Sequence, residues 1–264
     1  PSIIVYFLIG LLLFYWLGSH FKPLFALLSS LLIMYTPFMI RIAGLSTPDA
    51  LSSFLLFAAF YFIIERPSFI FLFIFFLLAI FARLDNIVTC LIILSFLFFY
   101  RKWEERITLL QYGTTAGALV ACYFVITWFT VRPFGWNIAF YPAFTHNLNL
   151  VYQHNPAFSL KKYAALAYSR AITAVVYYQF TLFAFLALLV AVPAFKPNHK
   201  LRFEQWFALL LIFVALFRFV LYPVLADRFY ISFYLCILIL LVKQYTKKDL
   251  VSNISLSTVN DHRL

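Results

Sequence analysis

The amino-acid sequence predicts an all-α protein, a polytopic transmembrane helical bundle, and three observations support this prediction. Of the 264 residues, 65% are hydrophobic and only 11% are charged, whereas a soluble domain carries about 25% charged residues. The mean hydropathy is +0.96. The apolar residues form long runs between short polar segments, and such runs are expected to be helical because lipid leaves no water to satisfy the backbone.

Nine apolar segments qualify, or nearly qualify, as membrane spans, since a helix needs about 20 apolar residues to cross the hydrocarbon layer. The third, fourth and fifth are short, so we expect them to tilt little or to extend through the polar loops. The expected spans are 2–18, 24–40, 50–64, 68–82, 87–100, 108–131, 171–195, 205–225 and 229–242. Together they form a transmembrane helical domain over residues 1–248, followed by a polar, disordered cytoplasmic tail over 249–264.

One connection, residues 132–170, is long, and it contains three prolines and no acidic residue. Its end, from Ala157 to Arg170, has apolar residues on one helical face and Lys161 and Lys162 on another. This pattern predicts a short amphipathic helix in the membrane interface. The loop fits either a structured functional element or a mobile connector, and both interpretations stay open.

The basic residues predict the orientation, because cytoplasmic loops carry an excess of Lys and Arg. One side of the predicted bundle holds 19–23, 65–67, 101–107, 196–204 and the tail, with twelve Lys and Arg. The other side, at 41–49, 83–86, 132–170 and 226–228, holds seven. The first side is therefore expected to be cytoplasmic and the second exoplasmic.

Several function classes find no support in the composition. The net charge of +11 is scattered over segment ends, which fits lipid headgroups better than a nucleic-acid surface. The three cysteines lie inside apolar runs without metal or disulfide spacing. The pair His146 and His154 matches no usual ligand pattern. No phosphate loop, nucleophile elbow or zinc-protease motif is present, so the sequence indicates no particular cofactor and leaves a divalent-metal requirement open.

Three of the nine acidic residues, Asp49, Asp85 and Asp227, lie at the ends of apolar segments on the exoplasmic side. Ionisable groups at membrane depth are costly and usually mark a site or a buried pair. Asp49 follows Pro48, so it either helps to start a helix or faces a polar cavity as a proton acceptor. Asp85 lies two residues after Arg83, and the two side chains either pair or serve a site.

Arginines accompany these acids. The planar guanidinium of Arg83 suits a phosphate. Arg218 and Arg228 suit a lipid phosphate at the interface, or else an internal ion pair with an aspartate. We therefore predict Asp49 and Asp85 as catalytic candidates and no metal ligands. The substrate-binding candidates are Arg41, Arg83, Asn86, Arg218, Asp227 and Arg228.

The segment Thr47-Pro48-Asp49-Ala50, the later Ala82-Arg83-Leu84-Asp85-Asn86 and the late Asp227-Arg228-Phe229-Tyr230 carry a family resemblance. Over about residues 40–235 the chain resembles the GT-C class of membrane glycosyltransferases, such as protein O-mannosyltransferases and lipid A aminoarabinose transferases.

The resemblance implies transfer of a sugar from a polyprenyl-phosphate carrier to a lipid, glycan or protein acceptor on the exoplasmic face. It implies that Asp49 is a second active-site acid and that Arg83 and Arg228 hold the carrier phosphate. The family's main catalytic acid lies in a first exoplasmic loop, which we expect in a segment preceding Pro1, and without it the chain is expected to be inactive. We expect a multi-pass protein of the bacterial inner or plasma membrane rather than the endoplasmic reticulum.

Two alternatives stay open. A transporter or flippase for a lipid-linked or polar substrate would also place charges at one mouth of a bundle. Transporters usually have Gly- or Pro-broken helices near the midplane. This chain has six glycines and few of them fall in mid-helix, which argues against that interpretation. A non-catalytic membrane subunit or an O-antigen-polymerase-like protein is the third interpretation. Membrane lipids are expected partners of all three, and nucleic acid of none.

Overall fold

The computed structural model of the chain is all-α over the described residues, which confirms the all-helical part of the prediction. It describes residues 2–37, 39–40, 44, 47–66, 68–100, 108–131, 161, 164–165, 168–169, 172, 178–191, 202–221 and 231–244. The helices of this part are α1 (Ser2–Gly18), α2 (Pro23–Met34), α4 (Thr47–Ile64), α5 (Phe69–Ala82), α6 (Asn86–Phe99), α8 (Leu109–Val131), α11 (Tyr178–Ala191), α12 (Phe203–Leu221) and the helix Ile231–Gln244.

Each of the nine apolar segments contains one of these helices. The expected span 24–40 is nevertheless wrong in extent, because α2 ends at Met34. Proline disfavours the helical conformation in the residue before it and lacks an N–H of its own, and Pro37 follows closely. The N–H groups of Met39 and Ile40 bond instead to the carbonyl oxygen of Thr36, which forms a separate turn.

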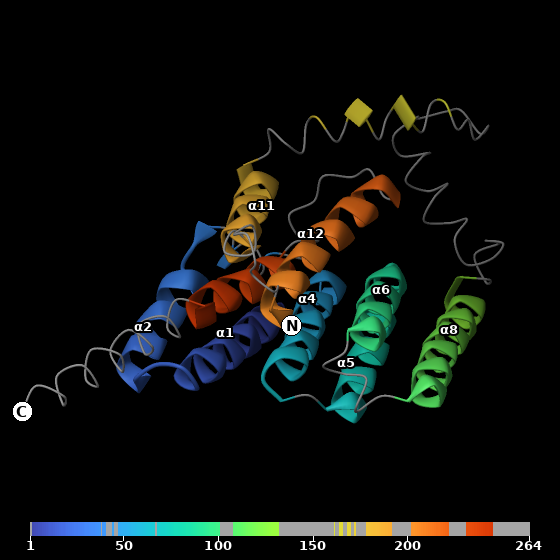
Figure 1. Ribbon diagram of the computed structural model, residues 1–264, viewed down its shortest axis with the longest axis horizontal. Coiled ribbons are helices and arrows are strands. Elements are labelled where there is room, and N and C mark those ends of the chain that lie inside the picture. Colours follow the sequence, from blue (N-terminus) through green and yellow to red (C-terminus); the bar gives the residue numbers. More distant parts are fainter. Residues whose placement is uncertain are drawn as a thin grey trace, which may run out of the picture.

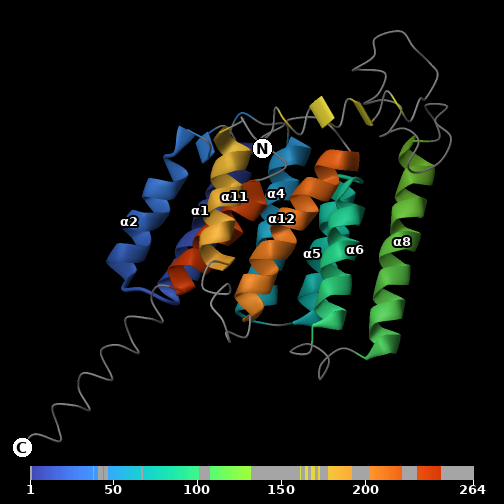
Figure 2. The same ribbon diagram turned by 45° about the horizontal axis from the view of Figure 1, so that its top comes forward.

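The helices stand side by side with their axes roughly aligned, and successive helices run in opposite directions (Figures 1 and 2). Along the chain, α1 packs on α2 and α4, and α4 packs on α5. The helix α12 packs on α6 and α11, and α8 lies against α5 and α6. This arrangement gives the bundle two ends, and the described connections 19–22 and 83–85 lie at opposite ends (Figure 2).

The helix α4 is at the centre of the bundle and is buried on nearly all sides over residues 55–61. Phe60 is fully buried and contacts Phe207 and Phe233, with ring centroids 5.8 Å apart in both pairs. Phe57 packs on Trp16 of α1 with ring centroids 5.4 Å apart. A helix that is apolar all round belongs in such a position, and its two ends are therefore held firmly by the neighbouring helices.

Within the described part of the chain, one helical stretch, Leu109–Phe129 in α8, is long and apolar enough to cross a membrane. The other apolar helices have 10–17 residues over the part whose side chains are described. Large apolar side chains face outward on the helices at the edge, for example Leu32 on α2 and Leu110 on α8, each 76% exposed. Extended apolar surface of this kind marks a contact with lipid or with another protein.

Two of the predicted segments lie outside the description. The connection 132–170, with its predicted interfacial helix, falls almost entirely outside the described residues, and so does the tail 249–264. Their predicted roles stay predictions.

Candidate functional site

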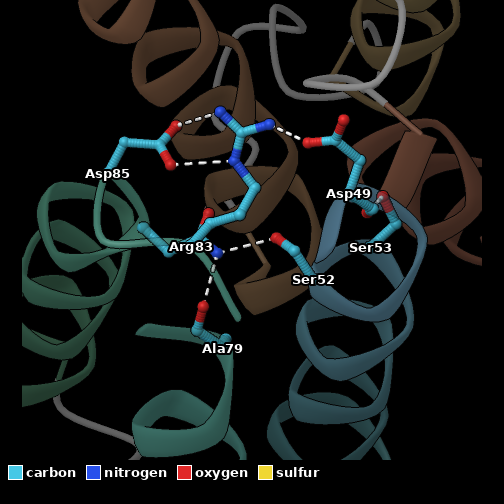
Figure 3. Close-up of polar contacts among 7 residues, drawn as sticks. Asp49, Ser52, Ser53, Ala79, Arg83 and Asp85 are labelled. Atoms are coloured by element: carbon cyan, nitrogen blue, oxygen red, sulfur yellow. Dashed lines mark hydrogen bonds and ion pairs between the residues drawn. The ribbon is translucent and has the colours of Figure 1, made fainter. Parts of the chain in front are cut away.

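Arg83 joins two carboxylates at one end of the bundle (Figure 3). Its Nε donates to Asp85 Oδ1 over 2.9 Å, and its Nη2 donates to Asp85 Oδ2 over 3.3 Å. Its Nη1 donates to Asp49 Oδ1. The guanidinium group therefore binds the carboxylate of Asp85 with two hydrogen bonds and the carboxylate of Asp49, on another helix, with one. We call Asp49, Arg83 and Asp85 the ion cluster.

Local backbone structure brings these three side chains together. Asp49 is in the first turn of α4, where a carboxylate is favoured by the helix dipole. Arg83 is the extended residue that ends α5, and Asp85 immediately precedes α6. The tight connection between α5 and α6 therefore presents an arginine and an aspartate to the start of α4. The sequence left two interpretations open for these residues, and the structure shows that Asp49 lies in the first turn of a helix and that Arg83 pairs with Asp85. A role of these residues in a site stays a prediction.

The ion cluster is largely buried but still reaches solvent. The side chains of Asp49, Asp85 and Arg83 are 7%, 13% and 21% exposed. Burial alone lowers the pKa of Arg83, but the carboxylates of Asp85 and Asp49 outweigh it and raise the pKa above its usual value. Arg83 is therefore a permanent cation, and two carboxylates against one guanidinium leave these three groups with a net charge of −1 when all are ionised.

Asn86 connects the ion cluster to the helices below it. Its Nδ2 donates to Ser52 Oγ on α4 over 2.7 Å and to the carbonyl oxygen of Ala79 on α5 over 2.8 Å. The side chain is fully buried. The amide thus links the first turn of α6 to both neighbouring helices, which holds the connection between α5 and α6 against α4.

A second polar cluster lies at the opposite end of α4, around Glu65. Trp16 Nε1, His20 Nε2 and Lys243 Nζ each lie 3.0 Å from Glu65 Oε1. Burial on its own raises the pKa of Glu65, but the hydrogen bonds from His20, Trp16 and Lys243 prevail and lower it to about 2. Glu204 lies 3.9 Å from Lys243 Nζ. We call Glu65 and its three partners the Glu65 cluster.

The Glu65 cluster was not among the predicted site residues. Glu65 ends an apolar helix, as Asp49 begins one, so the signal used for the three aspartates was present for it too. Its partners are residues 16, 20 and 243. They lie so far from Glu65 along the chain that no local sequence pattern could indicate these contacts. The contacts do place the segments after α1, after α4 and at the end of the helix Ile231–Gln244 at one common end, as the orientation prediction requires.

The structure brings four of the predicted site residues together: Asp49, Arg83, Asp85 and Asn86. Arg41, Asp227 and Arg228 lie outside the described residues, and so does the side chain of Arg218, which belongs to α12. Their predicted roles in substrate binding stay predictions. Among the described residues, no group of three or more His, Cys, Asp or Glu side chains lies close enough together to hold a metal ion.

The ion cluster has two chemical capabilities. A guanidinium that already holds two carboxylates can exchange one of them for a phosphate, because the two anions share the same bidentate geometry. A carboxylate released in this way can accept a proton from a hydroxyl group within hydrogen-bond reach. Comparison of the chain with known proteins found no matching family model, no matching curated protein and no matching solved structure.

Proposed function

We propose that this protein is an integral membrane glycosyltransferase of the GT-C type. It would move a sugar from a polyprenyl-phosphate carrier to an acceptor on the exoplasmic face. The observation that supports this most is the ion cluster, in which Asp49 and Asp85 share the guanidinium of Arg83 at one end of an apolar bundle. The motif residues quoted for the family resemblance supply all three members.

Membrane embedding is supported by the distribution of polar and apolar groups. The ion cluster and the Glu65 cluster lie at opposite ends of α4, and the helix between them is packed with aromatic and aliphatic side chains. The edge helices expose apolar side chains outward. A polyprenyl carrier is confined to the same apolar phase, so a transferase for it works best with its site at the bilayer surface.

The chemistry follows from the two capabilities of the ion cluster. The phosphate of the carrier would take the place of one carboxylate on Arg83, which releases that carboxylate next to the sugar. The free carboxylate then accepts the proton of the acceptor hydroxyl as its oxygen attacks the anomeric carbon. The bond from the anomeric carbon to the phosphate oxygen breaks, and Arg83 stabilises the charge of the departing phosphate.

The test is sugar transfer by the protein reconstituted in lipid nanodiscs. Undecaprenyl-phosphate carriers with a radiolabelled hexose or pentose are supplied with a membrane extract as the source of acceptor, and movement of the label is followed. With the protein expressed at full length, wild type and Glu65→Gln are expected to transfer label, whereas Arg83→Met and Asp49→Asn are expected not to. The Glu65→Gln variant is the matched control, because it alters the polar cluster at the other end of the same helix.

Two results would overturn the proposal. Transfer by Arg83→Met at the wild-type rate would remove the ion cluster from the chemistry. Label that crosses the bilayer of sealed proteoliposomes without a change of its covalent attachment, and that depends on Arg83, would establish a flippase instead.

A further inference from the structure

Two buried polar atoms lie just below the ion cluster without any hydrogen-bond partner. They are Asn86 Oδ1 and Thr89 Oγ1. Among the described residues, these two are the buried side-chain nitrogen or oxygen atoms that lack a hydrogen-bond partner. Both side chains are 0% exposed. Buried polar groups in folded proteins nearly always have a partner, and each exception calls for an explanation.

The hydrogen bonds of Asn86 Nδ2 determine where Oδ1 of the same amide lies. The Nδ2 atom lies 2.8 Å from the carbonyl oxygen of Ala79, which can only accept a hydrogen bond, so the amide nitrogen must be on that side. The same nitrogen donates to Ser52 Oγ. The Oδ1 acceptor is therefore held in one direction by contacts to two other helices, without a partner of its own.

Sequence spacing puts the two atoms on one face, beneath the ion cluster. Thr89 follows Asn86 by three residues and Asp85 by four, and residues with these spacings are neighbours on a helix surface. Ser52, the partner of Asn86, lies three residues after Asp49 on α4. Ser52 therefore lies one turn deeper than Asp49 on α4 (Figure 3), and the sequence spacing places Thr89 about one turn deeper than Asp85.

The chemistry of the two atoms selects a ligand. A carboxamide oxygen only accepts hydrogen bonds, and a threonine hydroxyl both accepts and donates. A phosphate oxygen offers no proton to Asn86 Oδ1, so this pair suits a neutral O–H group better than an anion. We propose that Asn86 Oδ1 and Thr89 Oγ1 bind a hydroxyl group of the sugar whose carrier phosphate is held by Arg83. This inference rests on the proposed function.

The pair would give the site its sugar selectivity. A site built to hydrogen-bond a substrate hydroxyl strongly rejects an analogue without it, because its own buried polar groups are then left unpaired. Asn86 and Thr89 would bind one hydroxyl group of the sugar, and the ion cluster would bind the phosphate that every carrier has. Sugar selectivity and carrier binding are therefore separable by mutation.

The experiment compares two ligands on the same protein. The affinities of undecaprenyl phosphate and of undecaprenyl-phosphate-linked glucose, mannose and arabinose are measured with the protein in nanodiscs. Wild type is expected to bind at least one glycosylated carrier more tightly than the bare carrier. Thr89→Val keeps the shape and removes the hydroxyl, so it is expected to reduce that affinity about tenfold and to leave the bare carrier unaffected.

Two further variants control for structural effects. Thr89→Ser retains a hydroxyl and is expected to keep most of the affinity for the glycosylated carrier. Thr127→Val removes a buried hydroxyl that already bonds to the carbonyl oxygen of Tyr123, and it is expected to leave both affinities unchanged. The melting temperature of Thr89→Val is expected to equal or exceed that of wild type, because the substitution removes an unpaired buried hydroxyl.

The outcomes separate this inference from the proposed function. If wild type binds the bare carrier and Thr89→Val binds every ligand as wild type does, the sugar-hydroxyl site is wrong. Equal affinity of wild type for all carriers, bare and glycosylated, also overturns the site. If wild type binds no carrier at all, the proposed function is wrong, and the sugar-hydroxyl site, which rests on it, is wrong too.

Discussion

Replacement of Arg83 by methionine is the most informative perturbation of stability. The substitution keeps much of the side-chain volume and removes three donors, two bonded to Asp85 and one to Asp49. It leaves two largely buried carboxylates without the cation that they share. Loss of one partner from a buried ion pair costs about 3–5 kcal/mol, and because Arg83 is 21% exposed we expect the lower end, about 3 kcal/mol.

The assay is thermal unfolding of the purified protein in detergent. A loss of 1 kcal/mol lowers the melting temperature of a domain of this size by about 2–4 °C, so Arg83→Met is expected to melt about 6–12 °C below wild type. Arg66→Met is the matched control, because Arg66 is exposed at the other end of α4 and surface changes usually stay within about 0.5 kcal/mol. Asp49→Asn added to Arg83→Met should recover part of the loss.

A melting temperature of Arg83→Met within about 2 °C of wild type would refute this reasoning. An equal loss in Arg66→Met would do the same, since it would show that any lost arginine is equally costly. Further destabilisation on addition of Asp49→Asn would contradict the claim that the two carboxylates repel each other without Arg83.

Three further predictions concern the rest of the bundle. The folded-state pKa of Glu65 is about 2, below its usual value of 4.5, so the stabilising contribution of Glu65 is complete above about pH 4.5 and is lost as the pH falls toward 2. The melting temperature of Glu65→Gln should therefore vary less over this pH interval than that of wild type. Parallel plots of melting temperature against pH for the two proteins would contradict this. Trp16→Phe keeps an aromatic ring against Phe57 but removes one bond to Glu65, which should cost about 1 kcal/mol in chemical unfolding. Phe60→Ala at the centre of the bundle should cost about 3–5 kcal/mol, and a loss below 1 kcal/mol would show that α4 is not central.

The sequence was sufficient to locate the helices, because in a chain this apolar each polar interruption is conspicuous. Arg83-Leu84-Asp85-Asn86 between two apolar runs predicted the connection between α5 and α6, and Pro48-Asp49 predicted the start of α4. The end of α2 was missed because apolar residues continue past Met34, whereas the proline at position 37 determines where the helix stops.

The site was predicted in part. Pairing of Arg83 with Asp85 follows from their proximity in the chain, and placement of Asp49 on the same side follows from counting helices. That Asp49 and Asp85 share one guanidinium depends on how α4 packs against α5 and α6, which is tertiary information. The contacts of Asn86 to Ser52 and Ala79 and the whole Glu65 cluster were beyond local sequence reasoning for the same reason.

The central claim is that the ion cluster and the Glu65 cluster face opposite sides of a membrane, and cysteine labelling in intact cells tests it most directly. Pro48 and Arg66 are exposed at the two ends of α4, and each is replaced by Cys after Cys90, Cys122 and Cys236 have been changed to Ala. We expect a membrane-impermeant maleimide to label position 48 from outside the cell and position 66 only after permeabilisation. Labelling of both positions from outside, or of neither before permeabilisation, would contradict the account.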